Sequence, residues 1–165
     1  MMSKKIENIL KFGMKMEKNA QDFYSFYANS LQDENLKKLF EEFVKIEQEH
    51  YKYLENILKS LGSQEPPISI SWVVDDQNKM VDPHILVDNS KILDTDFSDL
   101  TILRLAYLIE SDFAAFYKHA AEKVEDGNVK GLLLHLAKWE EEHEKFFKDR
   151  YHSLMKKEWE DLDLF

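Results

Sequence analysis

The position of the helix breakers constrains this 165-residue chain more than any other feature. All three prolines lie between Pro66 and Pro83, and the chain contains only four glycines. Proline interrupts a helix and glycine weakens one, so long stretches without them favour helices. The sequence therefore predicts an all-α protein whose helices lie on either side of residues 62–99.

Apolar residues recur at steps of three and four in four segments, which is the pattern of helices that bury one face. Two segments lie within residues 1–61 and two within residues 100–156, and a short connection makes each pair an antiparallel hairpin. Residues 62–99 are long enough to run the length of a helix. We expect a single domain over residues 1–165, a four-helix bundle of two hairpins joined by this long crossover.

Residues at the ends of these segments predict helix boundaries. Good N-cap residues indicate a start near Asp33, and Gly62 is typical of a helix end. Three candidates precede the third helix, namely Ser98, Asp99 and Thr101. The sequence Asp-Gly-Asn at 126–128 predicts the turn between the third and fourth helices.

Six titratable residues interrupt the apolar faces at matching places. The first and third helices carry one glutamate each, and the second and fourth carry a Glu-x-x-His pair; the residues are Glu17, Glu47, His50, Glu110, Glu140 and His143. Adding 93 to positions 17, 47 and 50 gives 110, 140 and 143, and the same offset carries Tyr24 onto Tyr117. This repeat predicts two related hairpins that bring four carboxylates and two imidazoles together.

Such a cluster needs a counter-charge, because four neighbouring carboxylates cannot all ionise in a dry core. A single glutamate on an apolar face is more often salt-bridged, but one glutamate on each of two helices plus two Glu-x-x-His pairs is the ligand set of di-iron and di-manganese bundles. Carboxylate and imidazole ligands suit iron or manganese better than a closed zinc site, which prefers thiolates. We predict two iron ions, with manganese or zinc as substitutes, held by these six residues.

The composition excludes other classes of site and partner. The chain contains no cysteine, which removes disulfides, thiolate nucleophiles and thiolate-held iron–sulfur centres. A formal net charge of −10 argues against nucleic acid or an anionic membrane as the main partner. The charged N-terminus lacks the apolar core of a signal peptide, and no apolar run is long enough to span a membrane. We expect a cytoplasmic protein.

The motifs resemble those of the rubrerythrin-type branch of the ferritin-like superfamily, over roughly residues 3–61 and 100–154. They are Glu17-(x6)-Tyr24, Glu47-x-x-His50, Glu110-(x6)-Tyr117 and Glu140-x-x-His143. The resemblance implies a ferritin-like bundle in which Glu47 and Glu140 bridge two metals and the other four ligands are terminal. It also implies that the two tyrosines donate hydrogen bonds beside the ligands, although they fit plain core positions equally well.

The chain departs from the usual pattern of that family in two places. Rubrerythrins usually carry a rubredoxin-like domain whose four cysteines hold an iron, whereas this chain has no cysteine. They also place a further glutamate one turn after the ligand of the third helix, where this chain has Phe113. The resemblance therefore does not extend to the NADH-linked peroxidase reaction in its usual form.

The resemblance implies a non-haem di-iron oxidoreductase that reacts with peroxide or dioxygen and takes electrons from a separate donor or from Fe²⁺. A ferroxidase or iron-handling protein is one alternative, and a non-enzymatic bundle with a structural dimetal site is another. We expect no nucleic-acid or membrane partner, and a homodimer stays open. Trp139, next to a predicted ligand, is interpreted as a core residue rather than as a redox relay.

Overall fold

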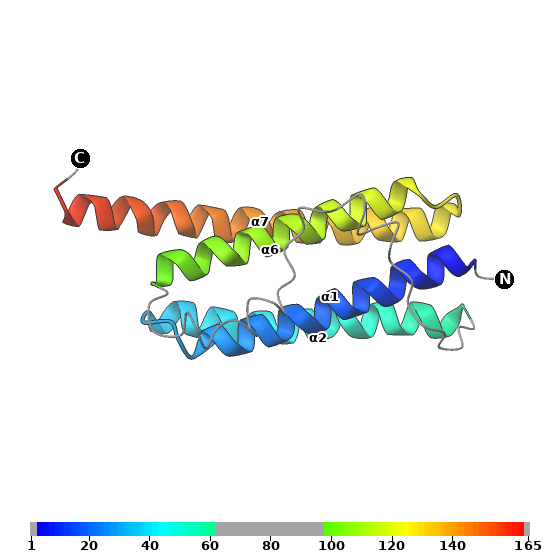
Figure 1. Cartoon of the computed structure of the whole chain (residues 1–165), viewed down its shortest axis with the longest axis horizontal. Helices are drawn as coiled ribbons and strands as arrows, with labels where there is room; N and C mark the ends of the chain where they lie inside the picture. The colour runs from blue at the N-terminus through cyan, green and yellow to red at the C-terminus, as the bar shows by residue number, and fades with distance from the viewer. Residues whose placement is uncertain (1–2, 62–97, 164–165) are drawn as a thin grey trace.

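The computed structural model describes residues 3–61 and 98–163. This part of the chain contains four helices and no strand; the helices are α1 (Lys4–Ala28), α2 (Glu34–Ser60), α6 (Asp99–Glu122) and α7 (Gly127–Asp161). They form two antiparallel hairpins, with α1 packed on α2 and α6 packed on α7 (Figure 1). The predicted all-α four-helix bundle is confirmed. None of the described helices is long and apolar enough to cross a membrane.

A serine or aspartate side chain caps the N-terminus of each helix; the four are Ser3, Asp33, Ser98 and Asp126. In α2, for example, Asp33 Oδ1 accepts hydrogen bonds from the backbone N–H groups of Asn35 at 2.8 Å and Leu36 at 3.1 Å. Such caps satisfy amides that have no partner within the helix. The start predicted near Asp33 is confirmed, and Ser98 is the one of the three candidates that caps α6.

Two predicted boundaries in the second hairpin differ from the structure. The turn lies before the predicted residues 126–128, because Asp126 caps α7 while Gly127 and Asn128 already belong to its first turn. The strong preference of aspartate for the N-cap decides this boundary, and glycine is tolerated at a helix start. Helix α7 also continues to Asp161, beyond the predicted end at residue 156, and its C-terminal end extends past the other helices (Figure 1).

Helix α6 begins at the opposite end of the bundle from the end of α2 (Figure 1). The chain between them therefore has to join opposite ends, as a bundle with one crossover requires. The predicted crossover itself, with the helix end predicted at Gly62, lies outside the described residues. Its path stays a prediction.

The core between the hairpins is rich in aromatic rings. The ring of Tyr24 in α1 lies 5.2 Å from that of Phe40 in α2 and 5.8 Å from that of Phe147 in α7, measured between centroids. All three side chains are fully buried. Burying a large apolar side chain contributes about 1.5–3 kcal/mol, so these contacts hold α1, α2 and α7 firmly against one another.

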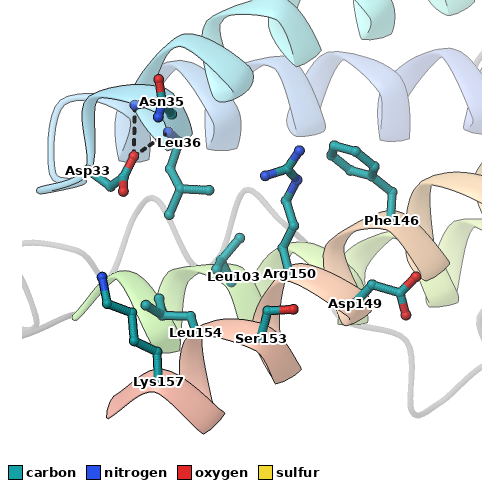
Figure 2. A pocket seen from close by; sticks show the side chains of 10 residues that line it. All are labelled: Asp33, Asn35, Leu36, Leu103, Phe146, Asp149, Arg150, Ser153, Leu154 and Lys157. Atoms are coloured by element: carbon teal, nitrogen blue, oxygen red, sulfur yellow. Dashed lines mark hydrogen bonds between the residues drawn. The ribbon is translucent and has the colours of Figure 1, made fainter. Parts of the chain in front are cut away.

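Polar contacts also join the hairpins at one end of the bundle. The carboxylate of Asp99, the first residue of α6, accepts hydrogen bonds from the backbone N–H groups of Gln32 at 2.8 Å and Asp33 at 2.9 Å. Beside this contact lies an open hollow of about 490 Å³ between α2, α6 and α7, with Arg150 and Lys157 on its α7 side (Figure 2). Its lining contains none of the six predicted ligands.

Candidate metal centre

The six predicted ligands lie together inside the bundle, with contributions from all four helices. Glu17, Glu47 and Glu110 occupy the middle of α1, α2 and α6. All four glutamate side chains are completely buried, the side chain of His50 is 8% exposed and that of His143 is 20% exposed. The cluster is therefore closed to solvent except beside His143.

The ligand atoms form two overlapping groups, in each of which all atoms lie within 4.8 Å of one another. One group contains Glu17, Glu47, His50 and Glu140; the other contains Glu47, Glu110, Glu140 and His143. Glu47 and Glu140 belong to both groups, which is the arrangement expected of carboxylates shared by two ions. Their role as bridging ligands stays a prediction.

Each site tyrosine donates a hydrogen bond to a glutamate of the other hairpin. The hydroxyl of Tyr24 donates to Glu110 Oε1 at 2.5 Å, and that of Tyr117 donates to Glu17 Oε1 at 2.8 Å. Burial, followed by the nearby carboxylates, raises the pKa of both phenols well above the ordinary value of 10.0. Both tyrosines therefore stay protonated and act as donors, and each fixes the orientation of one carboxylate.

Gly13 leaves room for one of these tyrosines. A Cβ atom at this position would lie 3.3 Å from the hydroxyl oxygen of Tyr117 and 3.1 Å from Cδ1 of Leu54. The 93-residue offset places Ala106 at the corresponding position of the second hairpin. The two halves of the site therefore resemble each other without being identical.

The buried polar atoms that lack a hydrogen-bond partner show what the cluster can hold. Among the described residues there are nine such side-chain atoms, and the six predicted ligands supply eight of them. These eight are Glu17 Oε2, both oxygens of Glu47, His50 Nδ1, Glu110 Oε2, both oxygens of Glu140 and His143 Nδ1. Unpaired buried polar atoms are costly, and so many in one place indicate a ligand. In Glu17 and Glu110, the tyrosine therefore occupies Oε1, and Oε2 is the oxygen that can bind a ligand.

The two histidines face carboxylates through the same ring atom. His50 Nδ1 lies 3.1 Å from Glu140 and 3.6 Å from Glu17, and His143 Nδ1 lies 3.7 Å from Glu110. Burial lowers the pKa of both imidazoles, but these carboxylates outweigh it and raise the pKa of His50 to about 11 and that of His143 to about 10. Without metal, both imidazoles are therefore in the positively charged form, with a proton on each ring nitrogen, at neutral pH.

The buried carboxylates respond to one another. Burial, and then the charges of neighbouring glutamates, raises the pKa of both Glu47 and Glu140 well above the ordinary value of 4.5. Burial also acts to raise the pKa of Glu110, but contacts with Glu140, His143 and Tyr24 stabilise its charged form and lower its pKa overall. The metal-free cluster thus retains protons, whereas divalent cations would replace them and use the unpaired atoms. The donor set therefore fits a metal site.

The fold and the cluster together define a ferritin-like bundle with a candidate metal centre. A family model described as Rubrerythrin matches residues 8–79 and 101–162, which include all six predicted ligands and both tyrosines. The chain therefore belongs to the rubrerythrin family. No curated protein and no solved structure matches it significantly.

The sequence pointed to Trp139 as a core residue, but it did not predict which rings lie against the two histidines. The indole of Trp139 stacks on the imidazole of His50, with centroids 5.2 Å apart and an angle of 15° between the planes. On the other side, Phe43 contacts His143 edge-on at 5.0 Å. The position of Trp139 next to a ligand is the signal that pointed to it, but its ring contacts depend on how α2 and α7 pack.

Proposed function

We propose that this protein is a non-haem di-iron oxidoreductase that reduces peroxide or dioxygen with electrons from a separate donor. The observation that carries the proposal is the set of eight unpaired buried atoms, because the residues that supply them form two groups that share Glu47 and Glu140. Membership of the rubrerythrin family supports iron as the metal.

Glu17 and His50 would hold one ion, Glu110 and His143 would hold the other, and the two shared glutamates would hold both. Iron bound here would supply one electron from each ferrous ion to a small oxidant. The chain's own contribution is to orient the ligands, exclude water and fix protons. The two tyrosines do the last of these, since each keeps its proton and donates a hydrogen bond to one carboxylate oxygen.

Access limits the substrate to small molecules. The four carboxylates are completely buried, and only the side chain of His143 is appreciably exposed among the six. Dioxygen and hydrogen peroxide fit this restriction. Among the described residues, the two overlapping groups are the only clusters of potential metal ligands. The proposed electron donor is a separate molecule.

Anaerobic loading with Fe²⁺ followed by rapid mixing tests the proposal. The protein should bind about two iron ions, and peroxide should oxidise them to ferric iron within seconds. Near-ultraviolet absorption measures this oxidation. Added reductant should then support repeated consumption of peroxide. Binding of a single ion, or no ferric absorption with either oxidant, would refute the proposal and favour a structural site.

The same experiment separates the remaining alternative. Continued uptake and oxidation of Fe²⁺ far beyond two ions per chain, without consumption of added reductant, is the behaviour of an iron-handling ferroxidase.

The variant Glu110→Ala tests the role of the ligands, because it removes a proposed terminal ligand and the acceptor of Tyr24. It should slow oxidation at least about tenfold, which corresponds to about 1.4 kcal/mol in the barrier.

A further inference from the structure

On the His50 side of the cluster, a chain of aromatic rings leads from the buried centre to the exposed ring of Tyr53. Trp139, which is half-buried, stacks on His50 with ring centroids 5.2 Å apart. Its indole also lies 5.9 Å from the ring of Tyr53, which is 36% exposed. Two readily oxidised side chains therefore connect a predicted metal ligand with solvent through ring contacts.

The corresponding positions on the other side of the cluster lack this chemistry. The 93-residue offset relates Trp139 to Ile46 and Tyr53 to Phe146. Rings still connect His143 with Phe43 and Phe43 with Phe146, at centroid distances of 5.0 and 6.2 Å. Phenyl groups are much harder to oxidise than indole or phenol. The ring contacts on the His143 side therefore do not provide side chains that can readily transfer an electron.

We propose that Trp139, which the sequence alone favoured as a core residue rather than a redox relay, forms with Tyr53 a one-electron route between the protein surface and the His50 side of the centre. The proposal rests on the proposed di-iron function and adds the place at which electrons enter. Reduction of dioxygen to two water molecules consumes four electrons and four protons. Two ferrous ions that become ferric supply two of the electrons, so the other two have to come from outside through the protein.

Each of these electrons passes singly. Trp139 gives one electron to the oxidised centre and releases its indole proton to water. Tyr53 then gives one electron to Trp139 and releases its phenol proton, while the indole nitrogen takes a proton back from water. A one-electron donor in solution reduces Tyr53, which regains its own proton. The net result is the transfer of one electron from the donor to the centre, with both side chains restored.

Withholding the donor makes the route visible, because the oxidised side chains then react further and gain oxygen. The full-length protein is loaded with Fe²⁺, mixed with air-saturated buffer without reductant, and mapped by peptide mass spectrometry. Trp139 and Tyr53 should gain oxygen first, and ascorbate as the one-electron donor should protect both. Trp159 is the internal control, since it is 40% exposed and lies twenty positions further along α7, about 30 Å away.

Two variants test the order of the route. Trp139→Phe should reduce oxidation of Tyr53 about tenfold, whereas Tyr53→Phe should increase oxidation of Trp139, because the electron that restores it no longer arrives. The matched control is Phe146→Leu, which changes the position related to Tyr53 and should leave both signals unchanged. Ferrous oxidation is followed by absorbance in every sample.

The outcomes are distinct. Equal or faster oxidation of Trp159 in the wild-type protein would show a freely diffusing oxidant and overturn the route, while normal ferrous oxidation in the same sample would leave the proposed function standing. Unchanged oxidation of Tyr53 in the Trp139→Phe protein would also overturn the route. Absence of ferrous oxidation in the wild-type protein would overturn both proposals.

Discussion

Loading the metal-free protein at pH 7 should expel protons, and the structure gives the range in which their number lies. The pKa values of His50 and His143, about 11 and about 10, mean that both imidazoles are protonated before metal binds. Metal can bind the Nδ1 atoms only after these two protons leave. Glu47 and Glu140, whose pKa values are also raised, contribute up to two more. We expect between about two and about four protons per chain for two bound ions.

Charge balance favours the upper end of this range. Two divalent ions bring four positive charges into a buried cluster, and four departing protons remove the same number. A largely buried site strongly disfavours any uncompensated charge, so binding that left the protons in place would be weak. Strong binding of metal therefore requires that these protons are released.

Isothermal titration calorimetry can count the protons. Zn²⁺ or Co²⁺, which avoid iron oxidation, are titrated into metal-free protein in two buffers of equal pH and different ionisation enthalpy. The difference between the apparent binding enthalpies gives the number of protons released. His143→Gln should lower this number by about one, whereas His135→Gln, at an exposed position, should not change it. Two ions bound with fewer than about one proton released would refute the reasoning.

The other predictions concern stability and the ligand set. Glu47 and Glu140 hold protons more tightly in the fold than in the unfolded chain, so their contribution to the stability of the metal-free protein falls as pH rises above about 4.5. The contribution of the two histidines is complete below about pH 6.5 and is lost as pH rises through about 10 to 11. Thermal melts should therefore show the gap between metal-bound and metal-free protein widening from pH 5 to pH 8, and identical melts would contradict this. Tyr24→Phe and Tyr117→Phe should each weaken metal binding about tenfold, measured by competition with a chelator, because one buried oxygen loses its donor. Glu47→Ala should lose more metal by elemental analysis than Glu17→Ala, because a shared ligand serves both ions. Gly131→Ala should raise the melting temperature by about 2–4 °C, since the added methyl group meets open space and alanine favours the helix by up to about 1 kcal/mol; an unchanged melting temperature would argue against this.

The helices and the six clustered residues were predictable because their signals are local and repeated. A glutamate on an apolar face is visible from helical spacing alone, and the 93-residue offset reinforces it. The same offset relates Asp33 to Asp126 and Asn35 to Asn128, so the capped starts of α2 and α7 repeat as well. The turn at 126–128 was misplaced because Gly127 is a turn signal in sequence but a first-turn residue after a strong cap.

The pairing of side chains across the bundle could not be predicted. Tyr24 shares a helix face with Glu17, yet its hydroxyl reaches Glu110 on the other hairpin. That choice depends on how far α1 and α6 are shifted relative to each other, and no local pattern encodes such a shift. The stacking of Trp139 on His50 is of the same kind, because it depends on the distance between α2 and α7.

The crossed tyrosine contacts have a consequence for the ancestry of the bundle. One hairpin alone contains a terminal glutamate, a Glu-x-x-His pair and a tyrosine, but the acceptor of that tyrosine lies on the other hairpin. Two identical hairpins facing each other about a twofold axis would supply all six ligands and both crossed contacts. The 93-residue repeat is what duplication and fusion of such a self-associating hairpin would leave behind. Later divergence would then account for Gly13 opposite Ala106 and Trp139 opposite Ile46.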